Sequence, residues 1–186
     1  VYIYDRIKEQ FSLFDKKTEY DVSISSEVKK IIKTEKGLIW IATLGQGLFI
    51  YDPASDNLKQ NSQHTSFVWD LSEDRTHRIY SSSLQEGLIC FDQNGKYIES
   101  FTSFLDNKDL GNSKINCVQT IDDKVWFSVG INNLGQFDSK TRNISYHSSH
   151  ENIGTIKSIS EFSEKELLVG SDNGLYLFNI LDERFT

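Results

Sequence analysis

The sequence is short of the features that usually mark membrane, nucleic-acid-binding or disulfide-stabilised proteins. It has no methionine, one proline and only two cysteines in 186 residues. Both cysteines lie in apolar runs, so we expect Cys90 and Cys117 to be buried thiols and not a disulfide framework. No apolar run reaches the roughly 18 residues of a membrane-spanning helix. A net charge of −7 argues against a dedicated nucleic-acid binder.

Signatures of catalysis are also absent. The sequence contains no HExxH, no G-x-S-x-G, no Walker loop and no dinucleotide fingerprint. The Gly45-Gln46-Gly47 segment resembles a fragment of a phosphate loop, but no helical pattern follows it, which favours a hairpin turn. His147 and His150 have a spacing found in metal sites, but a zinc site needs further converging ligands, and Glu151 is the one candidate beside them. We therefore expect no enzymatic activity, no cofactor and no metal.

What the sequence does contain is one apolar phrase repeated five times, each copy ending on Asp or Asn. The clearest copy is Gly47-Leu48-Phe49-Ile50-Tyr51-Asp52. The five copies end at Asp5, Asp52, Asp92, Asp138 and Asn179. A repeat of roughly 40–47 residues is typical of a four-stranded propeller blade. The repeat therefore indicates an architecture before any single residue is interpreted.

Four short runs in each full repeat predict four strands. The runs are rich in Ile, Val, Tyr, Phe and Trp and are bounded by Gly, Asn, Asp and Ser. No segment keeps a helical period, so we expect essentially no helix. The Asp that closes each third run can bond its own downstream backbone, and Asn94-Gly95 is a strong hairpin signal. The predicted fold class is an all-β β-propeller of four-stranded antiparallel blades.

The number of repeats predicts where the blades lie along the chain. We expect one partial propeller domain over residues 1–186, with a half-blade at 1–14 and blades at about 28–62, 68–102, 115–147 and 156–186. The chain begins with Val1 and lacks methionine, which suggests a processed or excised part of a longer protein. The leading half-blade lacks its two inner strands. The expected assembly is therefore about four and a half blades of a larger propeller, with seven blades as the expected total.

One copy resembles a known repeat closely. Residues 37–52 are similar to the two-component regulator propeller repeat, whose core reads G-x-[LI]-W-[IV]-[GA]-T-x-x-x-G-L-x-x-[YF]-[DN]. Its usual lead-in, V-x-x-I-x-x-D, is matched by residues 68–74. The resemblance covers nearly the whole chain, with departures at Asn133, Gly135, Gln136 and Leu168. The WD40 family fits less well, because Trp69-Asp70 lies in a first strand and does not close a third one.

The resemblance implies a non-enzymatic function. Such repeats typically form the periplasmic sensor region of bacterial hybrid two-component systems, whose histidine kinase lies beyond a membrane helix. This chain would then recognise a ligand, for which an oligosaccharide is the expected class, or mediate dimerisation. Its partners would be the rest of the sensor propeller and a homodimer partner, with no nucleic acid and with membrane contact only through the parent chain. The alternative is a propeller scaffold for protein–protein interaction without a small ligand, and an enzymatic lyase or hydrolase propeller ranks third.

Propeller geometry places two sets of loops on one face, and these loops supply the candidate ligand-binding residues. An oligosaccharide site combines an aromatic surface with amide and carboxylate partners for hydroxyl groups. Trp40, Tyr80 and Trp126 recur in register and are expected in the blade core. Trp69 breaks the pattern, because its matching positions are Lys29, Asn116 and Lys157, and it is expected to line the central channel. The candidate ligand-binding residues are Gln46, His64, Phe67, Trp69, Gln85, Glu86, Asn132 and Asp172.

Overall fold

Eighteen strands and no helix make up the part of the chain that the structure describes, which confirms the predicted all-β class. The structure is a computed structural model, and it describes residues 1–61, 66–83, 86–101 and 114–186. The strands form four four-stranded antiparallel sheets and one two-stranded hairpin. Within each sheet the strands pair in sequence order, so every sheet is a simple meander. This arrangement is a partial β-propeller, and we call the four sheets the first to fourth blades.

The strand bounds follow the repeat. The N-terminal hairpin consists of β1 (Tyr2–Asp5) and β2 (Gln10–Leu13). The first blade consists of β3 (Glu27–Lys33), β4 (Ile39–Leu44), β5 (Leu48–Asp52) and β6 (Asn57–Asn61). The second blade consists of β7 (Val68–Glu73), β8 (Ile79–Ser83), β9 (Gly87–Phe91) and β10 (Tyr97–Phe101).

The third and fourth blades repeat this order. The third blade consists of β11 (Val118–Ile121), β12 (Lys124–Val129), β13 (Asn133–Asp138) and β14 (Ile144–Ser148). The fourth blade consists of β15 (Ile156–Ser163), β16 (Glu166–Ser171), β17 (Gly174–Asn179) and β18 (Arg184–Phe185). None of the described segments forms a helix long and apolar enough to cross a bilayer.

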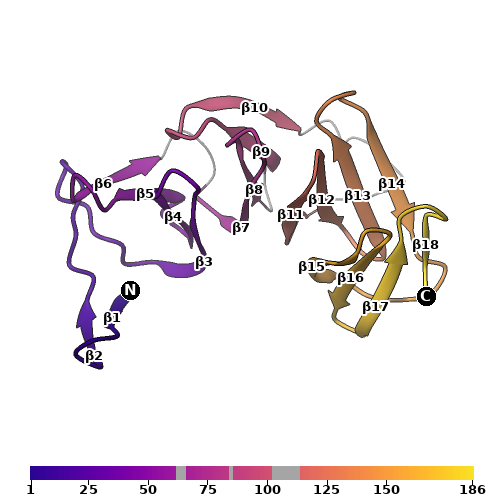
Figure 1. Ribbon diagram of the computed structural model, residues 1–186, viewed down its shortest axis with the longest axis horizontal. Coiled ribbons are helices and arrows are strands. Elements are labelled where there is room, and N and C mark those ends of the chain that lie inside the picture. Colours follow the sequence, from indigo (N-terminus) through magenta and orange to yellow (C-terminus); the bar gives the residue numbers. More distant parts are fainter. Residues whose placement is uncertain (62–65, 84–85, 102–113) are drawn as a thin grey trace.

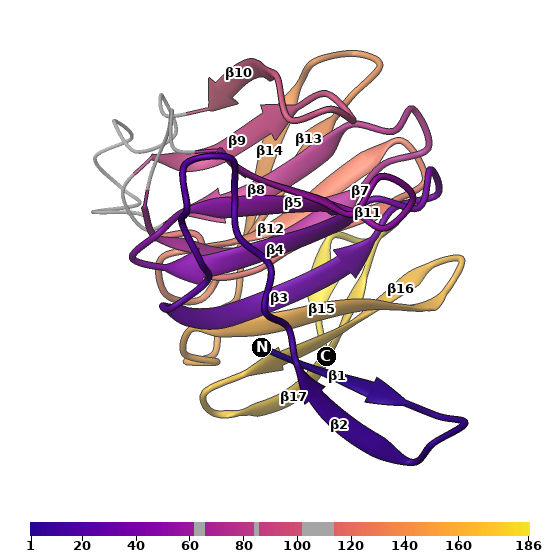
Figure 2. The same ribbon diagram turned by 90° about the vertical axis from the view of Figure 1, so that its left-hand side faces the viewer.

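The blades follow one another along an arc (Figure 1). The first strand of each blade, β3, β7, β11 or β15, lies on the inner side of the arc, and the fourth strand lies on the outer side. Neighbouring inner strands contact each other from β3 to β7, from β7 to β11 and from β11 to β15. The N-terminal hairpin projects away from the blades, as both views show (Figure 2).

The five repeated Asp and Asn side chains form five copies of the same turn. In each copy the side-chain Oδ1 accepts a hydrogen bond of 2.9 Å from the backbone N–H two residues further on. This bond replaces a ladder partner that the chain loses as it leaves the third strand. In the second blade Gly95, at φ 88°, completes the turn and donates its N–H to the carbonyl of Asp92 at 3.0 Å. The turn chemistry expected from the sequence is thus confirmed.

The recurring aromatic residues of the second strands fill the three interfaces between blades. Trp40 packs with the apolar side of β7–β9, Tyr80 with side chains of the third blade, and Trp126 with those of the fourth. All three are at most 1% exposed. Leu168, which stands at this position in the fourth blade, is half-buried. The aromatic repeat therefore marks the blade-to-blade core, as the sequence predicts.

The third blade departs from the others at its inner edge. Its first ladder pair joins Val118 to Phe127, so β11 begins later than the repeat pattern indicates. The preceding residues still run beside β12, but the Ser128 Oγ accepts the N–H groups of Asn116, at 2.7 Å, and Cys117, at 3.2 Å. The Ser128 hydroxyl thus takes the place of two backbone acceptors of the ladder. The strand β11 begins at the next residue, Val118.

Gly135, an irregularity of the repeat, has a packing reason. It pairs with Phe127 across β12 and β13. A Cβ at position 135 would lie 2.3 Å from Phe127 Cε2 and 2.5 Å from its Cζ. The ring of Phe127, which is fully buried, therefore occupies the space above the glycine. Gly135 therefore departs from the repeat because the Phe127 ring needs its space, and the glycine does not mark a weak strand.

Large apolar side chains are exposed at both ends of the arc. On the N-terminal hairpin Tyr2, Ile7 and Phe11 are 70%, 94% and 74% exposed. On the fourth blade Phe162 and Leu175 are 60% and 68% exposed. In the described residues these faces have no neighbouring blade to cover them, in contrast to the three buried interfaces between blades.

Candidate functional site

The inner strands line an open hollow of about 420 Å³. All four blades contribute to it, and the repeat-equivalent positions Lys29, Trp69, Asn116 and Lys157 all line it. The repeat register therefore brings together four residues that lie far apart in sequence. The other lining residues are Lys30, Asp70, Gln119, Ser158, Ile159 and Ser160. We call this hollow the channel pocket; its volume is in the range of small-molecule sites.

Trp69 lines the channel pocket, but one face of its ring is already occupied. The Lys29 Nζ lies 4.5 Å from the centroid of the Trp69 ring, which is a cation–π contact. The indole Nε1 is buried and has no hydrogen-bond partner among the described residues. Trp69 therefore holds a lysine ammonium in the pocket and does not offer the open aromatic surface that the sequence suggests.

Asp70 ties three inner strands together beneath the pocket. Its Oδ1 forms an ion pair of 3.0 Å with Lys30 Nζ on β3, and its Oδ2 accepts the N–H of Val118 on β11 at 3.1 Å. The Asp70 side chain is only 15% exposed, so these partners compensate a carboxylate that is largely removed from water. Close by, Ser72 and Thr120 share a hydroxyl–hydroxyl bond of 2.7 Å. The carboxylate and hydroxyl groups beneath the pocket are thus satisfied by partners within the protein.

Amide groups complete the lining. Asn116 lies just before β11 and Gln119 lies on it, and both are half-buried. They come from the blade between the lysines of the first and fourth blades. Gln119 Nε2 donates to the carbonyl of Thr120 at 3.1 Å. Within the described part of the chain, the side-chain amide of Asn116 makes no hydrogen bond. The Asn116 amide is therefore free to pair with the hydroxyl groups of a bound molecule.

Gln46, one of the predicted ligand-binding residues, is a structural clamp. Its Oε1 accepts the N–H groups of Ser25 and Ser26, both at 2.8 Å, and its Nε2 donates to the carbonyl of Ser23 at 3.0 Å. The amide therefore has three backbone partners in the loop that leads into β3. We had expected this side chain to face a ligand, and the structure instead satisfies it internally.

Asn132 and Asp172 have similar structural partners. Asn132, at φ 64°, forms two hydrogen bonds with Gly154. Its backbone N–H donates to the Gly154 carbonyl at 2.9 Å, and the Gly154 N–H donates to Asn132 Oδ1 at 2.9 Å. The Asp172 carboxylate accepts the N–H of Thr155 at 3.3 Å and pairs with Lys157 Nζ at 3.2 Å. Hydrogen bonds from Thr155 and Lys157 lower the pKa of Asp172. Of the two, only Asp172 acts on the channel pocket, through Lys157.

Of the remaining predicted residues, Phe67 and Glu86 do not line the channel pocket. Phe67 is 41% exposed next to β7, and Glu86 is half-buried before β9. His64 and Gln85 lie outside the described residues. The sequence missed Lys29 and Lys157 as site residues, although their repeat register with Trp69 was the signal that could have found them.

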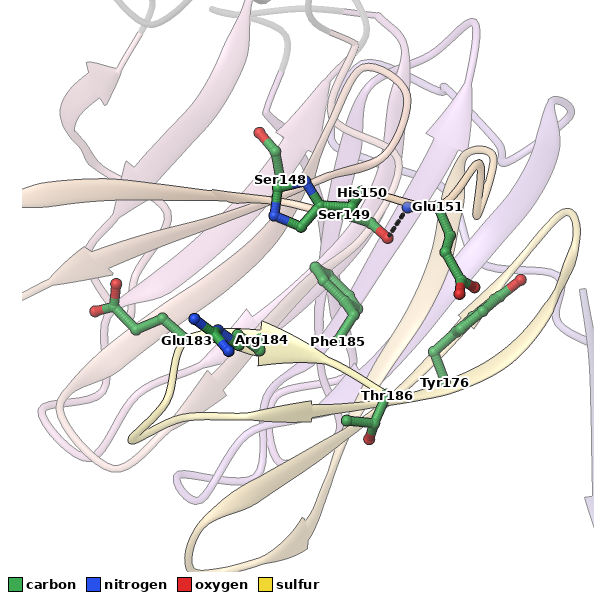
Figure 3. Close-up of a pocket in the computed structure, with 9 residues that line it drawn as sticks. All are labelled: Ser148, Ser149, His150, Glu151, Tyr176, Glu183, Arg184, Phe185 and Thr186. Atoms are coloured by element: carbon green, nitrogen blue, oxygen red, sulfur yellow. Dashed lines mark hydrogen bonds between the residues drawn. The ribbon is translucent and has the colours of Figure 1, made fainter.

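A second, smaller hollow of about 190 Å³ lies between the 148–151 loop and the outer strands of the fourth blade. Figure 3 shows the Phe185 ring pointing from β18 toward this loop, with Tyr176 and Glu151 side by side at one end. The loop is held by a bond of 3.2 Å from the Glu151 N–H to Ser149 Oγ. Its acidic and basic groups, Glu151, Glu183 and Arg184, are of mixed sign and mostly exposed. It offers fewer fixed polar groups than the channel pocket.

His147, near that hollow, gives the fold a pH dependence. It is 5% exposed, and its ring lies 5.0 Å from Phe178 and 5.9 Å from Trp126. Burial lowers the pKa of His147; Glu183, 3.6 Å from Nδ1, opposes this effect, and Lys124 adds to it. Because the folded protein resists protonation, the unfolded chain binds more protons, and stability falls as the pH drops below about 6.5.

We therefore expect the melting temperature to fall between pH 7.5 and pH 5.5, and to fall less in His147→Phe, which keeps the ring contacts. Thermal unfolding of both proteins at the two pH values measures this. Equal losses in the two proteins would contradict the assignment.

Both cysteines are buried and free, as the sequence predicts. Burial raises the pKa of the Cys90 and Cys117 thiols to about 12. At neutral pH both are protonated, so neither is an activated nucleophile. Among the residues that the structure describes, no group of three or more His, Cys, Asp or Glu side chains could hold a metal ion.

Comparison with known proteins shows the fold. No family model and no curated protein matches the chain. The structure of U3-55K superposes with a TM-score of 0.79 at 15% identity, over 99% of this chain and 56% of that one. A chain described as the extracellular domain of the hybrid two component system BT3049 from B. thetaiotaomicron superposes with a TM-score of 0.74 at 18% identity, over 98% of this chain. This chain spans about half the length of the first and 24% of the second.

Proposed function

We propose that this chain is a non-enzymatic, extracytoplasmic sensor segment of a hybrid two-component signalling protein, and that it recognises a small ligand in the channel pocket. The observation that carries the proposal is the pocket itself. One repeat position from each of the four blades converges on it, and the side-chain amide of Asn116 has hydrogen-bonding capacity that the described residues leave unused. Unused capacity of this kind in a hollow of small-molecule size is typical of a binding site.

Two further observations support a sensor over other propeller functions. The repeat over residues 37–52 resembles the two-component regulator propeller, and the fold is shared with the extracellular domain of BT3049. The three carboxylates at or beside the pocket, Glu27, Asp70 and Asp172, are each paired with a lysine, which leaves no free acid–base pair for hydrolysis among the described residues. The proposal places the chain outside the cytoplasm, as part of a protein anchored elsewhere in its sequence.

A thermal-shift screen tests the proposal. A ligand that binds only the folded protein raises its melting temperature in line with its affinity and concentration. We expect one class in a panel of neutral and acidic oligosaccharides to raise the melting temperature of the protein, and Asn116→Ala to reduce that rise. Ser149→Ala, in the second hollow, is the matched control and should leave the rise unchanged. A panel without any stabilising member, or one whose effect survives Asn116→Ala, would contradict ligand recognition in the channel pocket.

A further inference from the structure

We propose that Asn94 is a site of spontaneous deamidation, which turns this asparagine into a mixture of aspartate and isoaspartate. An asparagine followed by glycine favours this reaction, because glycine has no side chain to crowd its own backbone nitrogen. The sequence contains two such pairs, Asn94-Gly95 and Asn173-Gly174, and the structure distinguishes them. Asn94 does not line the channel pocket, so its chemistry is independent of the proposed function.

The reaction needs only the backbone, the side-chain amide and water. The Gly95 nitrogen attacks Asn94 Cγ and closes a succinimide ring, while the Cγ–Nδ2 bond breaks and the amide nitrogen leaves as ammonia with the proton of the Gly95 nitrogen. Water then opens the ring. Cleavage at Cγ leaves aspartate, and cleavage at the main-chain carbonyl carbon leaves isoaspartate, whose backbone runs through Cβ. Either product carries a negative charge that asparagine lacks.

Asn94 is exposed at the tip of the turn between β9 and β10. Its backbone N–H donates to Asp92 Oδ1 at 2.9 Å, but among the described residues its side-chain amide makes no hydrogen bond. The Gly95 N–H donates to the carbonyl of Asp92 at 3.0 Å. The side chain can therefore turn toward the next residue, and the opening of a single backbone bond releases the nitrogen that attacks. Exposed turns of this kind open at low cost in free energy.

Asn173, in the other pair, is restrained although it is also exposed. Its Nδ2 donates to the carbonyl of Asn152 at 2.8 Å, and its backbone N–H donates to Ser171 Oγ at 3.3 Å. The side chain must give up its hydrogen bond before Cγ can turn toward the backbone nitrogen of Gly174. The net strength of one such bond corresponds to a rate difference of roughly 5-fold in favour of Asn94.

The modified turn packs against the first blade, so the reaction has a structural consequence. Asn61 Nδ2 of β6 donates to the Gly95 carbonyl at 2.6 Å, and a Cβ at position 95 would lie 2.5 Å from Ile50 Cδ1. The backbone of Gly95 is thus fitted closely to its neighbours. Isoaspartate at position 94 adds a carbon atom to the main chain directly before this contact. The Gly95 carbonyl then shifts from Asn61, and the contact between the first and second blades is weakened at this point.

Incubation of the folded protein at mildly alkaline pH, where the backbone nitrogen loses its proton more readily, tests the proposal. Peptide mapping by mass spectrometry and enzymatic methylation of isoaspartate measure the product at each asparagine. We expect modification at Asn94 to be about 5-fold faster than at Asn173, and the melting temperature to fall as isoaspartate accumulates. Asn94→Gln, whose longer side chain cannot close the same ring, should keep its melting temperature; Asn94 has no positive φ, so glutamine fits there. Asn173→Gln is the matched control and should age like the wild type.

Each part of the proposal has an outcome that overturns it. Modification of Asn173 as fast as that of Asn94 overturns the choice of site. So does an Asn94 that stays intact in the folded protein but is modified in urea, since the turn would then protect it. Asn94→Asp introduces the charge without the extra carbon atom, and it should melt close to the fresh wild type. Isoaspartate at position 94 with an unchanged melting temperature would overturn the effect on the blade contact.

Discussion

Replacing Trp126 with alanine is expected to lower the free energy of unfolding by about 3–5 kcal/mol. The side chain is 1% exposed and lies between the third and fourth blades, with its ring 5.7 Å from Phe178. Truncation leaves a cavity between two sheets that cannot collapse without moving a whole blade. Because domains are typically stable by only about 5–15 kcal/mol, this loss is a large fraction of the total. Urea unfolding monitored by circular dichroism measures it.

Two variants sharpen the interpretation. Trp126→Phe keeps an aromatic ring at the interface and should recover much of the loss. Trp40→Ala removes the equivalent residue between the first and second blades, where Trp40 is fully buried. Hydrogen exchange should then accelerate most in β15–β18 for Trp126→Ala and in β3–β6 for Trp40→Ala. A uniform acceleration in both variants would show that the blades do not open one at a time.

Gly135→Ala is expected to destabilise the protein by about 1–3 kcal/mol. At a position without a positive φ, exchanging glycine for alanine normally stabilises by roughly 0.4–1 kcal/mol, because the unfolded chain loses entropy. Here the new Cβ would lie 2.3 Å from the ring of buried Phe127, which has no room to move away. The steric cost exceeds the entropic gain, so the sign is reversed.

A double-mutant cycle tests whether the aromatic ring is the cause. In a Phe127→Leu background the space above position 135 is less filled, and Gly135→Ala should cost little there. The difference between the two backgrounds is the coupling energy of the pair. A cost that is the same in both backgrounds would mean that the strand itself, and not the ring, requires glycine at position 135.

Much of the fold was predictable because its causes are local and repeated. The turn at Asp52, for example, needs only a carboxylate and the two residues that follow it, and the same five-fold pattern appears in the sequence. Trp40 and Trp126 were recognisable as core because they recur in register. The late start of β11 was not predictable, because it depends on the Ser128 hydroxyl from the neighbouring strand replacing ladder bonds.

The site was harder to predict than the fold. A glutamine in a loop looks the same in sequence whether it faces a ligand or, as Gln46 does, three backbone groups of another loop. Trp69 lines the channel pocket, but the sequence could not show that Lys29 lies over its ring. Partners contributed by distant segments decide the role of a polar side chain, and no spacing rule within one repeat contains that information.

The sequential pairing of strands within every sheet has a consequence for folding kinetics. Each ladder joins strands that are neighbours along the chain, so the loops that must close before a blade forms are short. All-β proteins usually fold slowly because their pairings are remote in sequence, but a row of meanders has a low contact order for its class. We therefore expect each blade to assemble early as a local unit, and the docking of one finished blade against the next to be the slower step.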